Sequence, residues 1–254
     1  MATKKERQRQ LAREAYQRRL GRQAQRARRT RQWWISSVSV VLVIGVGVGA
    51  AFLAGAFTPT KPSAASTVTC VYTPSGTAAR KVSPPPTKPN TAAHYTAAIK
   101  TNRGTVDISL LNSKAPCTVN SFVSLADQGF FNNTPCPRLD TTGLYILQCG
   151  DPTGTGSGGP GYKFGNENLK GAKYPADTVA MANSGTPDSN GSQFFLVYKS
   201  SPELPASYTP FGTITGGLGV LQEIAAKGDD NSNPYGGGKP NESVQIESVK
   251  ITKT

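Results

Sequence analysis

The stretch "NGSQFFLVY", residues 190–198, decides the fold, because a polar Gly-Ser-Gln turn leads there into an apolar run with two adjacent phenylalanines. Side chains along a β-strand point alternately to the two faces of its sheet. Phe194 and Phe195 are therefore expected on opposite faces. One of the two rings can fill the core, and the other needs another use.

Several further stretches carry the alternation or the composition of strands. A hairpin is predicted around the turn Asn102-Arg103-Gly104, where apolar residues alternate with polar ones through residues 105–111. The other predicted strands are residues 95–101, 144–148, 178–182, 193–198, 211–214 and 244–252. Strands and helices do not alternate along the chain, so a parallel doubly wound sheet is not expected.

Two segments have the spacing of amphipathic helices instead. Residues 115–129 place Val119, Phe122 and Val123 on one face, and Gly129 can cap the end. Residues 218–227 form the second predicted helix. The sum is an antiparallel β domain with two helices over residues 95–254, which is enough chain for one full core.

The basic charge of the chain is confined to its first residues. Residues 1–32 contain twelve Lys/Arg and two Glu, a net charge of +10, whereas the whole chain carries +13. Such a tail could bind nucleic acid. We favour an orientation signal that lies against anionic lipid, and expect no nucleic-acid partner.

An apolar segment follows this tail at residues 35–57, with 23 residues that include no charge and no proline. As a helix it would be about 34 Å long, enough for a hydrocarbon core of about 30 Å. With Trp33 and Trp34 at the interface, residues 33–57 are predicted to be one transmembrane helix. A cleaved signal peptide is the alternative, because Ala54-Gly55-Ala56 resembles a cleavage site, but the apolar run exceeds the usual length.

The Lys/Arg excess before the span predicts a cytoplasmic N-terminus and an exported domain at the cell membrane. Residues 58–94 are rich in Pro, Thr, Ser and Ala, and are predicted to be an extended linker. A proline-rich signalling ligand is the less favoured alternative for this segment.

All four cysteines lie beyond the span, namely Cys70, Cys117, Cys136 and Cys149. This placement predicts at least one disulfide in an oxidising compartment. Four cysteines allow three pairings, which the sequence leaves open. The pair Cys136–Cys149 is the least expected. If both strands alternate regularly, Cys136 lies on the same face of the sheet as Arg138, whereas Cys149 lies on the face opposite to that of its neighbour Gln148.

Several kinds of chemistry are not expected of this chain. His94 is the only histidine, so a His-dependent catalytic triad is not expected. No CxxC or Cys/His cluster is present, so neither a metal site nor a cofactor is predicted. The glycine-rich residues 150–162 lack the Gly-Lys-Ser/Thr ending of a phosphate-binding loop. Chemistry that needs no nucleophile, metal or cofactor remains.

Three stretches together resemble the cyclophilin family of peptidyl-prolyl cis-trans isomerases over residues 95–254. They are "PCPRLDTTGLYILQCGD" (135–151), "VAMANSGTPDSNGSQFFLVY" (179–198) and "LPASYTPFGTI" (204–214). The resemblance implies a mostly β fold, a closed antiparallel eight-stranded barrel with two capping helices. It implies isomerase activity on X-Pro bonds, and the predicted topology makes exported or cell-envelope polypeptides the expected substrates. The oligomeric state is left open, and a monomer is favoured.

The resemblance also assigns the site. Arg138 corresponds to the catalytic arginine, and the expected substrate-binding residues comprise two groove glutamines, a backbone-binding pair and the residues of a proline pocket. These residues are Gln148, Gln193, Ala182, Asn183, Phe195, Leu204, Tyr208, Tyr145 and Ile146.

The chain departs from the family pattern at three places. Gln148 follows Arg138 by ten positions rather than eight, so two residues are inserted before Tyr145 and Ile146. Pro137 replaces the usual histidine before the arginine. Tyr208 replaces the pocket histidine, and Glu203 falls where a tryptophan is usual. A proline-peptide binding or chaperone module with little turnover is therefore the alternative function.

The predicted topology can be tested on intact cells. Because twelve Lys/Arg precede the span, the tail should be inside and the domain outside. External protease should digest the domain and leave the tail intact. Digestion of the domain only after lysis would contradict this orientation.

Overall fold

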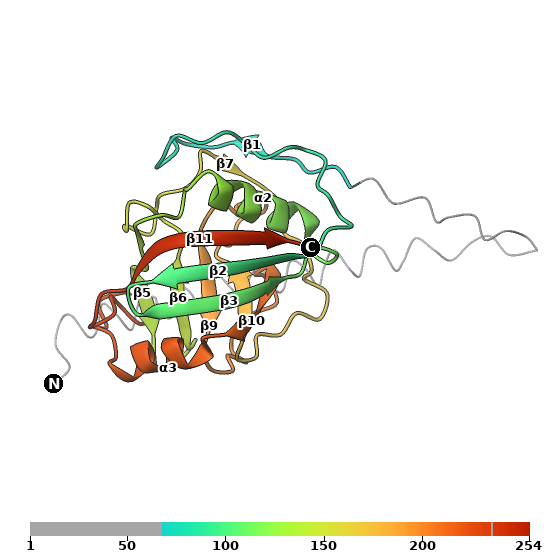
Figure 1. Ribbon diagram of the computed structural model, residues 1–254. Coiled ribbons are helices and arrows are strands. Elements are labelled where there is room, and N and C mark those ends of the chain that lie inside the picture. Colours follow the sequence, from blue (N-terminus) through green and yellow to red (C-terminus); the bar gives the residue numbers. More distant parts are fainter. Residues whose placement is uncertain (1–67, 235) are drawn as a thin grey trace, which may run out of the picture. The chain divides into compact units, whose positions relative to one another are not determined.

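A curled antiparallel sheet of nine strands carries the fold (Figure 1). The computed structural model describes residues 68–234 and 236–254. Across the sheet the strands follow the order β4 (Thr134–Pro135), β11 (Gln245–Lys253), β2 (Tyr95–Thr101), β3 (Gly104–Leu110), β10 (Pro210–Gly216), β8 (Thr178–Met181), β9 (Phe194–Val197), β6 (Ile146–Cys149) and β5 (Arg138–Asp140). A separate two-stranded sheet pairs β1 (Thr73–Pro74) with β7 (Tyr162–Lys163).

The expected eight-stranded closed barrel is wrong in two respects. The sheet has nine strands, and among the described residues no ladder joins its edge strands β4 and β5. These two edges are consecutive in the chain, with only Cys136 and Pro137 between them. The N–H of Cys136 donates to the Val244 carbonyl on the β11 side, at 2.9 Å, and proline has no N–H to donate. The backbone itself therefore crosses from one edge to the other, and the sheet remains a half-barrel.

The predicted hairpin is confirmed by β2 and β3, which pair from Thr96 opposite Ser109 to Thr101 opposite Gly104. Both predicted helices are confirmed as well. They are α2 (Pro116–Asp127) and α3 (Leu218–Ala226), which lie at opposite ends of the curled sheet (Figure 1).

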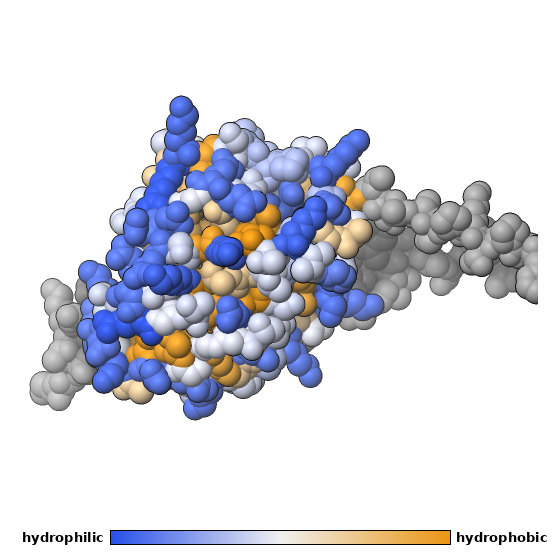
Figure 2. Space-filling model, viewed as in Figure 1, coloured by the Kyte–Doolittle hydropathy of each residue, from blue (hydrophilic) through white to orange (hydrophobic). Residues whose placement is uncertain are grey.

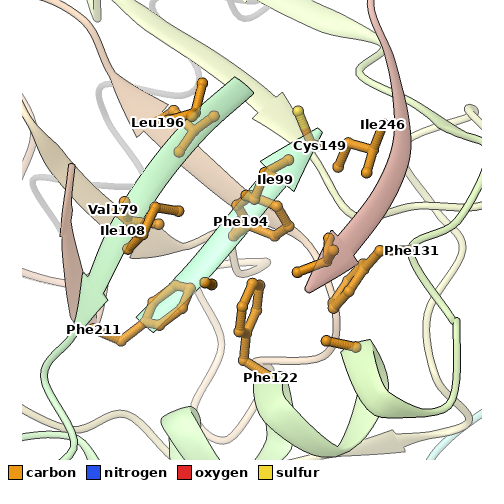
Figure 3. Packing of buried hydrophobic residues seen from close by; sticks show 14 of the residues in the cluster. Ile99, Ile108, Phe122, Phe131, Cys149, Val179, Phe194, Leu196, Phe211 and Ile246 are labelled. Carbon is orange, nitrogen blue, oxygen red and sulfur yellow. The ribbon is translucent and has the colours of Figure 1, made fainter. Parts of the chain in front are cut away.

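The main core lies inside the curled sheet and is rich in phenylalanine. Phe122 of α2 meets Phe194 edge to face, with ring centroids 5.5 Å apart, and contacts Phe131 and Phe211 at 5.1 and 5.3 Å (Figure 3). Edge-to-face contacts of this kind are favourable beyond their buried area. One side chain from a helix thus joins two strands and a loop in a single packed cluster.

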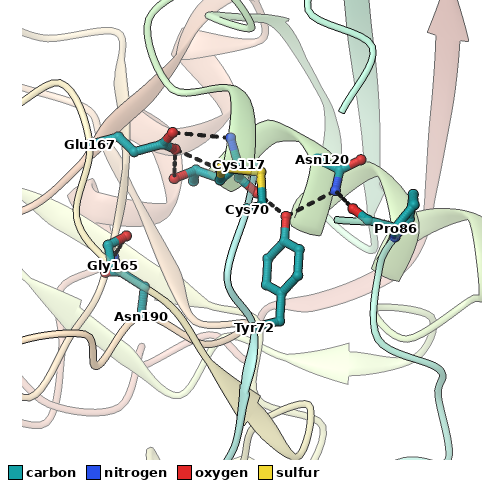
Figure 4. The surroundings of a disulfide bond; sticks show 9 residues. Cys70, Tyr72, Pro86, Cys117, Asn120, Gly165, Glu167 and Asn190 are labelled. Carbon is teal, nitrogen blue, oxygen red and sulfur yellow. Dashed lines mark hydrogen bonds between the residues drawn. A yellow bond between two sulfur atoms is a disulfide. The ribbon is translucent and has the colours of Figure 1, made fainter. Parts of the chain in front are cut away.

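The first turn of α2 depends on a residue far away in sequence. Pro116 starts the helix, but Ala115 has no side chain that can cap it. The carboxylate of Glu167 accepts hydrogen bonds from the N–H groups of Cys117 and Thr118, at 3.1 and 2.8 Å (Figure 4). The predicted cap at the other end is confirmed by Gly129, whose φ of 69° lies in the left-handed region that favours glycine.

Residues 68–94, expected to be part of a spacer, instead pack on the domain. A disulfide joins Cys70 to Cys117 at the start of α2 (Figure 4). Farther along, the guanidinium of Arg80 donates to the carbonyls of Phe130, at 3.0 Å, and Asn132. The polar groups of this segment therefore find partners on the loops around α2. Residues 58–67 of the predicted linker lie outside the described residues.

The second disulfide, Cys136–Cys149, is the pairing that we expected least. The expectation assumed that Cys136 and Arg138 belong to one regular strand. In the structure β4 ends at Pro135 and β5 begins at Arg138, so the chain bends between them. Cys136 therefore turns into the main core, where Cys149 also lies, and both are at most 2% exposed.

The face shown in Figure 2 carries β11, β2 and β3, and its hydrophobic areas are interrupted by hydrophilic residues. In the part of the chain that the structure describes, neither helix could cross a bilayer. The predicted tail, residues 1–32, and the predicted span, residues 33–57, lie outside the described residues.

The role of Glu167 leads to a prediction about stability. Glu167→Gln should lower the free energy of unfolding by about 1 kcal/mol, because one of its oxygens can no longer accept from the helix start. Urea unfolding measures the change. Glu223→Gln on the exposed face of α3 is the matched control and should stay within about 0.5 kcal/mol. Equal losses in the two variants would contradict the capping role.

Candidate active site

Strand β9 divides its two phenylalanines between two apolar clusters, as the alternation predicted. Phe194 is fully buried in the main core. Phe195 points to the other face of the sheet and belongs to a second, smaller cluster. The Phe195 ring therefore helps to form a separate apolar cluster outside the main core.

This second cluster comes from the three neighbouring strands β6, β8 and β9 and from four connecting segments. Its buried members are Ile146, Tyr174, Ala180, Phe195, Val197 and Leu204, and its partly buried members are Leu144, Ala172, Ala182 and Tyr208. Ala180 and Phe195 are cross-strand partners, and so are Ile146 and Val197. Residues 146, 182, 195, 204 and 208, all expected in the substrate site, are thus brought together.

Aromatic rings cover one side of this cluster. Tyr208 meets Phe195 edge to face, with ring centroids 5.5 Å apart. The Tyr174 hydroxyl donates to the Tyr208 carbonyl at 2.8 Å and accepts from the Tyr208 N–H at 3.1 Å. Burial raises the pKa of Tyr174, so this hydroxyl keeps its proton. The tyrosine that replaces the family histidine is thereby fixed in place.

A chain of hydrogen bonds runs beside the apolar cluster and joins three residues expected in the site. Arg138 and Gln148 are cross-strand partners, and the Arg138 Nη1 donates to Gln148 Oε1 at 3.4 Å. Gln148 Nε2 in turn donates to Gln193 Oε1 at 2.9 Å. Gln148 also pairs with Phe195 across the strands, which places the polar chain at the edge of the apolar cluster.

The Arg138 guanidinium also contacts the Gly236 carbonyl and the Asp140 carboxylate. Its Nε donates to the Gly236 carbonyl at 3.2 Å, and its Nη2 lies 3.6 Å from the carboxylate of Asp140. Asp140 is buried, and its other oxygen accepts from the N–H groups of Thr142 and Gly143 at 3.1 and 3.0 Å. The Asp140 carboxylate thus orients Arg138 and also binds the loop between β5 and β6, where the two extra residues lie. Arg138 and Gln148 remain cross-strand partners despite this insertion.

Gln193, the last residue of this series of hydrogen bonds, also binds the glycine-rich loop. Gln193 Nε2 donates to the carbonyls of Gly156 and Gly158, both at 3.0 Å. Because an amide nitrogen cannot accept, these two carbonyls fix which way the Gln193 side chain faces. Its oxygen must then face Gln148, and the oxygen of Gln148 must face Arg138. Each side chain in the series therefore donates to the next, from Arg138 through Gln148 and Gln193 to the loop carbonyls.

Asp151 organises the loop that supplies those carbonyls. This fully buried carboxylate accepts from the N–H groups of Thr153, Gly156 and Gly158 at 2.8, 2.8 and 3.0 Å. Burial alone would raise the pKa of Asp151, but these hydrogen bonds and one from the Thr153 hydroxyl outweigh it and lower the pKa. The glycine-rich loop is thus built around an ionised group.

The expected backbone-binding pair lies next to Gln193. The Ala182 N–H donates to the Gln193 carbonyl at 2.9 Å. The Asn183 side chain donates to the Ser207 carbonyl at 3.0 Å and accepts from the Gly185 N–H at 3.0 Å. Ala182, Asn183, Gln148 and Gln193 all line one groove of about 600 Å³.

Tyr145 is the one expected site residue that the structure places elsewhere. Its φ of 47° turns the chain just before β6, and its ring packs on Tyr198 with centroids 6.2 Å apart, against the main core. Lys199 Nζ lies 4.4 Å from the centroid of the same ring. Ile146, the first residue of β6, belongs to the second cluster, whereas Tyr145 packs on the side of the main core. Glu203 is exposed and takes no part in the apolar cluster.

Sequence reasoning missed the residues that support the site. Asp140 and Asp151 stand in the quoted stretch "PCPRLDTTGLYILQCGD", and an acidic residue beside a predicted site residue was the available signal. Tyr174 carried no signal in its local pattern. Within residues 68–234 and 236–254 no group of three or more acidic, histidine or cysteine side chains could hold a metal ion.

The lowered pKa of Asp151 predicts how stability depends on pH. Asp151→Asn should cost about 1–3 kcal/mol at pH 7, because the buried donors lose an acceptor. The carboxylate stabilises the fold above its unfolded pKa of about 3.9, and this contribution is lost as the pH falls through the folded value. The difference between wild type and variant should therefore shrink in acid. Urea unfolding at pH 7 and in acid measures this difference in the free energy of unfolding. Asp127→Asn, at an exposed position, is the control. A difference that does not depend on pH would contradict the role given to the Asp151 carboxylate.

Comparisons with known proteins agree with this site. The family model described as cyclophilin type peptidyl-prolyl cis-trans isomerase/CLD matches residues 96–251. A probable peptidyl-prolyl cis-trans isomerase B of Mycobacterium leprae is 48% identical over 215 residues, which cover 75% of this chain and 69% of that protein. A protein of the same name from Mycobacterium tuberculosis strain H37Rv is 46% identical, with 76% and 67% covered.

Solved structures lead to the same family. A crystal structure of a Cryptosporidium parvum cyclophilin type peptidyl-prolyl cis-trans isomerase superposes with a TM-score of 0.57 at 31% identity, and covers 63% of this chain and 99% of that one. Another, determined in the presence of the dipeptide Ala-Pro, gives a TM-score of 0.56 at 32% identity with the same coverage. The chain belongs to the family of cyclophilin-type peptidyl-prolyl cis-trans isomerases.

Proposed function

We propose that this isomerase acts on X-Pro bonds of exported polypeptides, and that Arg138 is its catalytic residue. The observation that carries the proposal is the hydrogen-bonded chain Arg138–Gln148–Gln193 at the edge of an apolar cluster. An apolar cluster suits a proline ring, and a fixed guanidinium beside it suits the amide that must twist.

The reaction needs only differential stabilisation. Amide resonance opposes rotation about X-Pro with a barrier of about 18–20 kcal/mol. In the twisted state the proline nitrogen loses conjugation and regains a lone pair, which a planar amide does not offer. A donor aimed at that nitrogen therefore stabilises the twisted state more than either planar isomer, which is the requirement for catalysis.

The supports of Arg138 make it a suitable donor. Its Nε is held by the Gly236 carbonyl and its Nη2 by Asp140, while the side chain is 17% exposed. A donor whose direction is already set needs little reorganisation when charge develops. In this proposal Phe195, Ile146, Leu204 and Tyr208 hold the ring, and Ala182 and Asn183 bind the peptide backbone while the other half of the substrate turns.

Export of the substrates is proposed from the sequence and the cysteines. The uncharged residues 35–57 and the Lys/Arg-rich residues 1–32 favour a single-pass anchor at the cell membrane with the domain outside. The two disulfides support an oxidising compartment, because disulfides persist there. Polypeptides that fold outside the membrane are therefore the proposed substrates.

Arg138→Ala should lower the exchange rate between cis and trans about a hundredfold, because lost donors of this kind typically cost about 3 kcal/mol. Much of the peptide affinity should remain, since the apolar cluster is unchanged. Arg138→Lys should restore little, because an ammonium lacks the planar fork of donors. The measurement is NMR exchange in an X-Pro peptide at saturating concentration, on the full chain.

Two controls accompany this test. Melting curves check the fold, and Arg103→Ala removes an arginine that pairs with Glu242 away from the site and should retain wild-type exchange. An unchanged rate in Arg138→Ala would reject Arg138 as the catalytic residue. Peptide binding without exchange in the wild type would favour the binding-module alternative.

A further inference from the structure

The groove beside the glutamine pair has a wall that comes from residues before β2. Ser75, Gly76 and Thr77 line it, facing a space that Gln148 and Gln193 also line. We call residues 73–77 the strap. The family model matches residues 96–251, so the strap lies outside the residues that this model matches.

The segment just before the strap is attached to helix α2. In this segment, Cys70 is bonded to Cys117, and the Tyr72 hydroxyl donates to the Cys117 carbonyl at 2.8 Å and accepts from Asn120 at 2.9 Å (Figure 4). Burial raises the pKa of Tyr72, so this hydroxyl keeps its proton. The segment before the strap is therefore held by a covalent bond and by hydrogen bonds.

The strap itself is paired with the domain. Thr73 and Pro74 form β1 and lie opposite Lys163 and Tyr162 of β7. Beyond β1, the N–H of Ser75 donates to the Gly161 carbonyl at 2.9 Å, and that of Ala79 to Gly159 at 2.8 Å. The strap is thus an ordered wall of the groove in the described structure.

The chemistry of the groove is polar with one charge. Its lining consists of glycines, hydroxyl side chains, amides, Pro160, Ala182, Tyr162 and Lys163, and includes no Asp or Glu. Tyr162 is buried, with its hydroxyl 2.8 Å from that of Ser121. Lys163 is its neighbour on the strand and lines the groove, partly exposed. No ion pair of Lys163 occurs within residues 68–234 and 236–254.

We propose that the strap and Lys163 form a subsite that selects an acidic side chain in the substrate segment flanking the X-Pro bond. This inference rests on the proposed function, because Gln148 and Gln193 connect the groove to the catalytic group. A peptide that lies across these glutamines in an extended form advances about 3.3 Å per residue, so a nearby residue enters the groove. There a carboxylate meets an ammonium group and several hydroxyl donors.

The test uses a peptide series with the full chain. Each peptide has acetylated and amidated ends, a central Ala-Pro, and one Glu at successive flanking positions, with Gln at the same position as its partner. At one position Glu should bind about two- to fivefold more tightly than Gln, the range of a partly exposed ion pair. The preference should shrink as salt rises. Calorimetry gives affinity, and NMR exchange on the Gln peptides reports isomerisation separately.

Variants assign the preference to the subsite. Lys163→Gln should bind both peptides equally, whereas Lys170→Gln, at an exposed position outside the groove, should keep the preference. Ser75→Glu places a carboxylate on the strap, where only the backbone of Ser75 is used for pairing, and should abolish or reverse the preference. Ser75 is exposed, so this variant is expected to fold.

The outcomes separate the two proposals. Exchange of the Gln peptides without a Glu preference at any position would overturn the subsite and leave the proposed function standing. A preference that survives Lys163→Gln or Ser75→Glu would also overturn it. Failure to bind or exchange any X-Pro peptide would overturn the proposed function and the subsite together.

Discussion

The two-residue period of strand β9 is the constraint on which the rest of the structure depends. All four of its residues are buried, with Phe194 in the main core and Phe195 in the second cluster. A strand that is apolar on both faces must be covered on both faces. The curled sheet and α2 cover one, and the loops that carry Tyr174, Leu204 and Tyr208 cover the other. The site exists because the sheet has a second apolar face.

The series of polar side chains Arg138–Gln148–Gln193 reaches β9 at the start of that strand. Gln193 precedes the strand, and its amide is oriented by two carbonyls of the glycine-rich loop, which are in turn placed by Asp151. At the other end of the series, the Asp140 carboxylate orients Arg138. Two buried carboxylates thus bracket a directional series of hydrogen bonds. In low dielectric such a series is strong when complete and costly when one member is lost.

The disulfides serve different parts of this arrangement. Cys136–Cys149 links the bend between β4 and β5 to the end of β6, close to Arg138 and Gln148 in the chain. Cys70–Cys117 attaches the strap to the start of α2, where Glu167 also binds. One bond therefore secures the strands that carry the polar chain, and the other secures the strap that forms one wall of the groove.

The sequence by itself predicted the hairpin, both helices, the opposite faces of Phe194 and Phe195, and the family, because these depend on local periodicity and on motifs read in order. The tertiary structure decided the rest. It paired Cys136 with Cys149 because the chain bends after Pro135, and it turned Tyr145 to the core side through a left-handed φ. It also laid the strap beside the groove. Each of these outcomes depends on partners distant in sequence, which no local pattern specifies.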